Sequence, residues 1–143
     1  MTALEFIKFF VNMGILYEQA FIIGDYKASN KLYDKEMKIF KQLENNIELA
    51  NQVLPILLDE KYSKYTRISA ATHCLALGFN KKEAVKTLKQ IKKIKIDPTF
   101  AAFAAEIALK KWRWRRRRFW KYNIYKGISG TENIGSREDE IEE

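Results

Sequence analysis

The chain has 143 residues, of which 47% are hydrophobic and 31% charged, and its formal net charge at pH 7 is +8. This length and composition fit one soluble domain with a core of its own. One cysteine and one histidine exclude an internal disulfide and leave too few ligands for a zinc site. We therefore expect no cofactor and no metal, and we expect a reducing cytoplasm as the location.

The positive charge is concentrated in one short stretch. Residues 1–109 carry a net charge of +4, residues 110–121 (KKWRWRRRRFWK) carry eight positive charges and no negative one, and residues 122–143 carry a net charge of −4. The last segment is rich in glycine, serine, asparagine and glutamate, which is typical of a weakly ordered polar tail. The sequence thus predicts one helical domain over residues 1–120 and a tail over residues 121–143.

The first predicted helix begins at residue 2 or 3 and ends at Ile23, with Thr2 as its N-cap and Glu5 as the capping-box partner. Charged residues interrupt this apolar segment, and it has neither a positively charged start nor a small-residue cleavage site. We therefore expect a core helix rather than a signal sequence or a membrane span. The stripe expected to face the core consists of Leu4, Ile7, Val11, Ile15 and residues 20–22.

Two further helices follow a Gly24-Asp25 break. Asp25 is a good N-cap for a helix over residues 26–43. The third helix, over residues 47–58, contains Pro55, so a kink or a restart is expected near Leu54. The inner face predicted for residues 26–43 consists of Ala28, Leu32, Met37, Ile39 and Phe40.

The fourth helix, over residues 65–78, is the segment around which the fold should be organised. It has little polar surface, so neighbours must cover it on more than one side. Its small residues Ala70 and Ala71 allow another helix to approach closely, and Gly78 is a helix stop. A fifth helix over residues 81–94 is expected after the cap Asn80, with a buried row of Ala84, Leu88 and Ile91.

The sixth helix is expected after Asp97, with Pro98 at its first position. A shift of 34 residues aligns this part of the chain with the middle helices, as helix-pair repeats do. The predicted helices and this period indicate an all-α fold, a short HEAT/ARM-like right-handed α-solenoid of about six helices. The aligned pairs are Ala50 with Ala84, Leu54 with Leu88, Leu57 with Ile91, and residues 70–71 with residues 104–105.

The few polar residues inside the predicted helices do not suggest catalysis. His73 and Cys74 are adjacent, so their side chains point about 100° apart on a helix; a partly buried histidine with a local hydrogen bond is the better interpretation. Asp59 and Arg67 are interpreted as a structural salt bridge between successive helices. The sequence contains no phosphate-binding glycine loop, serine nucleophile motif or metal-ligand spacing, so we do not expect an enzyme.

Two sets of residues are candidates for binding. Tyr26 and Tyr33 are seven residues apart and therefore share a helix face, next to Asp25 and Asp34; they could be caps and surface aromatics, or a partner-binding patch. The basic stretch could bind nucleic acid, an anionic membrane surface or an acidic protein, or simply be a solvated helix end. Its candidate residues are Trp112, Arg113, Trp114, Arg116 and Arg117.

Three segments resemble a bacterial family of domains of unknown function, number two thousand and nineteen. They are GDYKASNKLYDKEMKIFKQL (residues 24–43), YTRISAATHCLAL (residues 65–77) and AAEIALKKW (residues 104–112), and the resemblance covers about residues 3–112. It implies a short HEAT-like α-solenoid and no catalytic residues. The arginine run and the tail after Trp112 depart from the family pattern.

The resemblance also implies a role. Small HEAT-like domains of this kind occur as immunity proteins beside polymorphic and contact-dependent toxins. The first hypothesis is therefore a non-enzymatic protein that binds and neutralises a cognate toxin domain. The alternative is a nucleic-acid-binding HEAT-like module that uses residues 110–121. If Asp25, Asp34, Glu44 and Glu48 gather on one surface, the first hypothesis is favoured. If lysines 81, 82, 86, 89, 92 and 93 instead join the arginine run in one stripe, the second is favoured.

Overall fold

A computed structural model describes the backbone of residues 1–125 and the side chains of residues 1–114. All regular elements in this part of the chain are helices, and it contains no strand, which confirms the all-α prediction. Its elements are α1 (Ala3–Ile23), α2 (Tyr26–Glu44), α3 (Ile47–Val53), the short 3-10 helix η1 (Ile56–Leu58), α4 (Lys64–Leu77), α5 (Lys81–Lys92) and α6 (Ala101–Tyr125).

The first helix boundaries follow the predicted caps. The Thr2 hydroxyl accepts a hydrogen bond from the Glu5 amide at 3.2 Å, and the Glu5 carboxylate accepts one from the Thr2 amide at 2.9 Å. Gly24 ends α1 with φ +74°, a left-handed conformation that glycine adopts without steric cost. Asp25 Oδ1 then accepts from the Ala28 amide at 3.0 Å and starts α2. These local signals were sufficient to predict both helix ends.

The helix predicted over residues 47–58 is divided, as Pro55 indicated. α3 ends at Val53, and η1 begins at Ile56 because proline has no amide hydrogen to continue the helical ladder. α4 begins one residue earlier than predicted, with Ser63 as its N-cap, and Gly78 ends it with φ +83°.

The start of the last helix differs from the prediction. α6 begins at Ala101, not at Pro98, because Phe100 has φ +59° and a helix cannot pass through that conformation. Asp97 still caps the helix, since its Oδ2 accepts from the Ala101 amide at 3.2 Å. Asn80 lies at the N-cap of α5, but its side chain makes no capping hydrogen bond.

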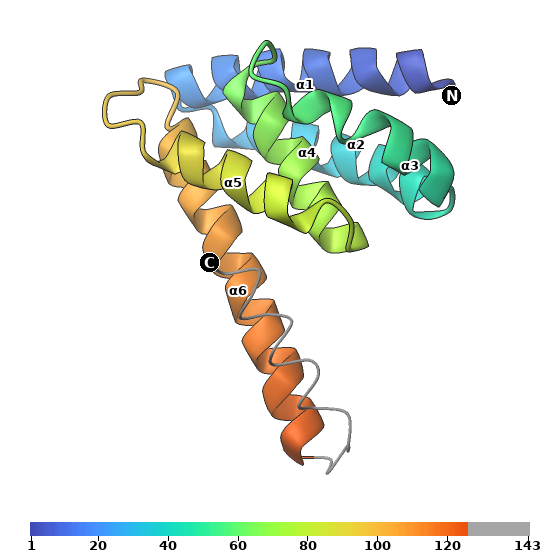
Figure 1. Ribbon diagram of the computed structural model, residues 1–143. Coiled ribbons are helices and arrows are strands. Elements are labelled where there is room, and N and C mark those ends of the chain that lie inside the picture. The colour runs from blue at the N-terminus through green and yellow to red at the C-terminus, as the bar shows by residue number, and fades with distance from the viewer. Residues whose placement is uncertain (126–143) are drawn as a thin grey trace.

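α6 is longer than predicted. It continues past residue 120, the predicted domain boundary, and reaches Tyr125. Figure 1 shows that its second half extends away from the other helices. The remainder of the predicted tail, residues 126–143, lies outside the described residues.

α4 is the central helix, as its sequence indicated. It packs against α1, η1, α5 and α6, and Ala70, Ala71 and Cys74 are fully buried on it. At Gly14, α1 comes so close to α4 that a Cβ atom would lie 2.0 Å from Oγ1 of Thr66. The same Thr66 hydroxyl donates a hydrogen bond to the Phe10 carbonyl at 3.2 Å. This close approach therefore requires a glycine at position 14.

The predicted inner stripe of α1 is only partly correct: Ala20 is buried, and Ile7, Val11 and Phe21 pack against the core, but the other three residues do not. Leu4, Ile15 and Ile22 are 60%, 46% and 56% exposed. α1 has two apolar faces, and the one rich in aromatic residues enters the core because it buries more surface. The residues that face the core are Phe6, Phe10, Met13, Gly14, Tyr17 and Ala20.

By length and composition alone α1 could also cross a membrane, although 33% of its most apolar window is buried and core helices share these properties.

The inner face of α2 is also displaced from the prediction. Only Phe40 of the five predicted residues is fully buried, and the other four are half-buried. The buried row is Ser29, Glu36, Phe40 and Leu43. The residues aligned by the 34-residue shift are, by contrast, similarly buried in both copies, except that Ala70 is buried and Ala104 half-buried. At most 1% of each of the following is exposed: Ala50, Leu54, Leu57, Ala84, Leu88 and Ile91.

Candidate functional site

A buried polar cluster joins α2 to α4. Glu36 and His73 are 4% and 3% exposed, and Oε2 of Glu36 lies 2.8 Å from Nε2 of His73. The Ser69 hydroxyl donates to Oε1 of Glu36 at 3.0 Å. The Phe40 ring stacks on the His73 ring at 4.2 Å between centroids. His73 is more deeply buried than predicted, and its hydrogen bond is not local, because Glu36 lies 37 residues away in the sequence.

The cluster links the two helices through the Glu36 carboxylate. Ser69 and His73 both bond to Glu36 and not to each other, so they do not form a serine–histidine pair. Burial, and next the nearby charge of Glu36, raises the pKa of the Tyr17 hydroxyl. Burial raises the pKa of the Cys74 thiol to about 12, which keeps it protonated and unreactive at neutral pH.

Sequence reasoning missed Glu36. One signal could have identified it: Glu36 lies four residues before Phe40 and seven before Leu43, on the apolar row of α2. A carboxylate in such a row needs a buried donor as partner. His73 is the one histidine of the chain and lies on another apolar helix, so it was the natural candidate.

The predicted salt bridge between Asp59 and Arg67 is not present among the residues that the structure describes. Arg67 Nε instead donates to the Tyr62 carbonyl at 3.1 Å. The carboxylate of Asp59 is exposed and accepts from the Lys61 amide at 2.9 Å. Both side chains thus form a hydrogen bond with the backbone of the turn between η1 and α4.

The structure separates the four residues predicted to bind a partner. Tyr26 and Tyr33 are 72% and 55% exposed and share one side of α2. Asp25 is used as the helix cap, and Asp34 lies nine residues further, about half a turn round the helix. Asp25 and Asp34 therefore do not lie on one side of the helix. Five exposed lysines also lie on α2: Lys27, Lys31, Lys35, Lys38 and Lys41.

A row of lysines covers the outer side of α5. Residues 82, 86, 89 and 93 follow helical spacing and lie opposite the buried row of Ala84, Leu88 and Ile91. Lys82, Lys86 and Lys93 are exposed, and Lys89 is half-buried. Their spacing in the sequence was sufficient to place them on one face.

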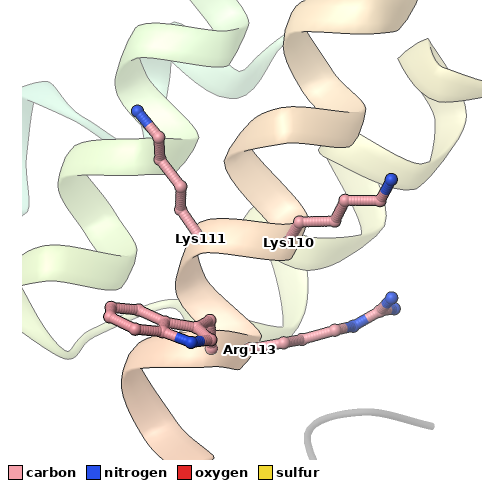
Figure 2. Close-up of a pocket in the computed structure, with 4 residues that line it drawn as sticks. Lys110, Lys111 and Arg113 are labelled. Carbon is pink, nitrogen blue, oxygen red and sulfur yellow. The ribbon is translucent and has the colours of Figure 1, made fainter. Parts of the chain in front are cut away.

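α6 packs against α5 and adds further positive charge. Lys110, Lys111, Arg113 and Trp114 line a shallow surface hollow, and Trp114 is 58% exposed. In Figure 2, Lys110 and Arg113 extend from one side of α6 and Lys111 from the other. Trp112, predicted as part of the basic patch, is half-buried and packs against the core. Arg116 and Arg117, also predicted for the basic patch, belong to α6, and their side chains lie outside the part of the chain that the structure describes.

Comparisons with known proteins give no family assignment. No family model matches the chain, and neither curated proteins nor solved structures are significantly similar to it. The resemblance of its three segments to a family of unknown function therefore stays a prediction.

Proposed function

We propose that this protein is a non-enzymatic binding module, built as a HEAT-like solenoid, which holds the phosphate backbone of a nucleic acid on the surface of α5 and α6. The observation that carries this proposal is the positive charge of two helices that pack together: exposed lysines on the outer side of α5, and Lys110, Lys111 and Arg113 on α6. In the sequence, residues 81–125 contain fifteen lysines and arginines but only three acidic residues. Side chains of this kind neutralise phosphates and release their counterions.

Two of the three acidic residues do little to reduce this field, whereas Glu83 is exposed on α5. Asp97 is buried and lies 3.5 Å from Lys64 Nζ, and Glu106 lies 3.6 Å from Lys110 Nζ. Trp114 is 58% exposed and lines the same hollow as Lys111, and aromatic side chains interleaved with basic ones are typical of surfaces that bind single strands. Single-stranded RNA or DNA therefore fits the α5–α6 surface better than a duplex whose bases are enclosed.

Fluorescence anisotropy with a labelled single strand, measured over a series of salt concentrations, tests the proposal. K82E/K86E/K93E on α5 and K110E/K111E on α6 should each weaken binding about tenfold or more. Each should also flatten the salt dependence, by about 0.7 in log–log slope for each phosphate contact that is lost. The matched control is K31E/K35E/K38E on α2, which changes the net charge as much as the α5 variant does.

Two results would refute the localisation. If the α2 control lost as much affinity as the α5 variant, binding would follow net charge and not a defined surface. If the unaltered protein bound the strand without salt dependence, phosphate contacts would not be its basis. A circular dichroism spectrum of each variant separates lost binding from lost folding.

A toxin-neutralising immunity protein is the second candidate, and the exposed tyrosines of α2 favour it. Tyr26 and Tyr33 present two large, rigid side chains to one side, which is typical of anchors at protein interfaces. Co-expression with a toxin domain encoded beside its gene provides the test. Y26A/Y33A should abolish protection of the cell, whereas K82E/K86E/K93E should retain it. The opposite pattern would assign protection to the basic surface.

A further inference from the structure

The outer side of α1 carries a continuous stripe of side chains that nothing in the described chain covers fully. Leu4, Ile15 and Ile22 are 46–60% exposed, Lys8 is exposed, and Val11 and Glu18 are half-buried. Figure 1 shows α1 along one edge of the helix stack. Large aliphatic side chains in such a row are unusual on a surface that only meets water. We call the six residues the α1 stripe: Leu4, Lys8, Val11, Ile15, Glu18 and Ile22.

The spacing of the α1 stripe is that of a coiled-coil seam. Its successive members are alternately four and three residues apart. This alternation keeps one row of side chains facing a neighbouring helix along its whole length. A helix that only lay on a core would need one such row, and α1 already has one in Phe6, Phe10, Met13 and Tyr17. The second row therefore has the form of half a helix pair.

The α1 stripe is complementary to itself when two copies run antiparallel. With a two-fold axis at the level of Met13, each residue of the stripe faces a residue of the partner, and the two residue numbers add up to 26. Leu4 then meets the partner's Ile22, and Val11 meets the partner's Ile15. Lys8 meets the partner's Glu18, so the two charged members of the stripe pair with opposite sign. Parallel copies would instead bring Lys8 against the partner's Lys8.

We infer that the protein forms a two-fold symmetric homodimer through antiparallel packing of the α1 stripes. The symmetry makes the two contacts of each kind equivalent, as in most dimers of identical chains. It buries the aliphatic residues and leaves neither charge of the seam unpaired. A lipid surface fits less well, because Lys8 and Glu18 lie inside the stripe and not on a basic flank.

A charge-swap cycle tests both the dimer and its register. Sedimentation velocity between about 1 and 100 μM should show a dimer for the unaltered protein. K8E places two negative charges opposite each other at both ends of the seam, and E18K places two positive charges there, so each should weaken dimerisation about tenfold or more. K8E/E18K restores opposite charges and should restore the dimer. K31E and E44K, at exposed positions on α2, are the controls.

Three outcomes would overturn the inference. A monomer at 100 μM would exclude a dimer of useful stability. A double variant no better than the single ones would exclude this register. Binding of a monomer to vesicles of phosphatidylcholine and phosphatidylglycerol, lost in Ile15→Asp, would assign the stripe to lipid. Circular dichroism of each variant establishes that it folds, which the exposure of these positions predicts.

Cross-linking gives an independent readout. Asn12 is exposed beside the stripe and lies next to the proposed axis, so Asn12→Cys should form a disulfide with the same residue of the partner. Gln19→Cys, equally exposed and seven residues along the same flank, lies far from its own copy and should oxidise much more slowly. The native Cys74 is buried and does not interfere. Equal rates for the two variants would contradict the antiparallel register.

Discussion

Asp97 provides the sharpest test of how the fold is held together, because its carboxylate joins three parts of the chain. The side chain is 3% exposed. Oδ1 accepts from the Thr99 amide at 2.9 Å and also from the Thr99 hydroxyl. Oδ2 accepts from the Ala101 amide at 3.2 Å and lies 3.5 Å from Lys64 Nζ. Asp97 thus shapes the turn before α6 and ties that turn to the start of α4.

We expect Asp97→Ala to lower the free energy of unfolding by about 2–4 kcal/mol. Loss of a helix cap costs about 1 kcal/mol, and hydrogen bonds to a charged group contribute about 1.5–3 kcal/mol. The two contributions overlap at the Ala101 amide and do not simply add. Lys64 adds less, because its side chain is 32% exposed. For a domain of this size, the fall in Tm should be roughly 6–16 °C.

The loss should depend on pH in a defined direction. Burial raises the pKa of Asp97, but hydrogen bonds from Thr99 and the charge of Lys64 outweigh burial, so the pKa lies below its ordinary value. A lowered pKa in the folded state means that the ionised carboxylate stabilises the protein above the unfolded value of about 3.9. This stabilisation is lost as the pH falls through the folded pKa. The difference in Tm should therefore be complete at pH 7 and shrink in acid.

Thermal unfolding followed by circular dichroism at pH 7 and in acid measures both effects. Asp97→Asn keeps the size and one acceptor oxygen, so it should be destabilised less than Asp97→Ala. Asp34→Ala, which removes an exposed carboxylate from α2, is the matched control and should change Tm little. A difference in Tm that stayed equal at both pH values would refute the role assigned to the ionised carboxylate. A Tm of Asp97→Ala close to that of the unaltered protein would refute its role in the fold.

Three further substitutions test the interior, each by urea denaturation. Gly14→Ala brings a Cβ atom to 2.0 Å from the Thr66 hydroxyl and should cost about 3 kcal/mol or more, whereas Gly24→Ala, with nothing near its Cβ, should cost only about 1–2 kcal/mol. Ala71→Leu overfills a site with no exposed surface and should cost about 1–3 kcal/mol; an unchanged midpoint would mean that α4 can shift to accept it. Glu36→Ala leaves the buried His73 ring and the half-buried Ser69 hydroxyl without their acceptor and should cost about 2–4 kcal/mol, and a cost below 1 kcal/mol would mean that water replaces the carboxylate.

The parts of the fold that could be predicted are those determined by neighbouring residues. Thr2, Gly24 and Asp25 set helix ends through hydrogen bonds and backbone angles that involve residues close in the sequence. Pro55 divides the third predicted helix for the same kind of reason. The start of α6 was misplaced because the positive φ of Phe100 leaves no mark in residue type.

The parts that could not be predicted depend on contacts between distant segments. Periodicity showed that Leu4 and Ile15 share a face of α1, but it could not show that the opposite face, with Phe10, enters the core. Glu36 and His73 pair across 37 residues, and no local pattern joins them. The spacing of the lysines predicted that they share one face of α5, whereas the packing of α5 against α6 required the structure.

The arrangement of the helices makes the two proposed surfaces separable, which leads to a last prediction. α4 packs against α1 on one side and against α5 and α6 on another, so a dimer formed through the α1 stripes leaves both α5–α6 surfaces open to ligand. A nucleic-acid strand long enough to reach both would bind with avidity, whereas a short one would occupy a single surface. Lys8→Glu should therefore weaken binding of a long strand much more than binding of a short one. K8E/E18K, which restores the dimer, should restore the affinity for the long strand. Equal losses for the two lengths would mean that Lys8 itself contacts the strand, and no loss for either would mean that binding does not use the dimer.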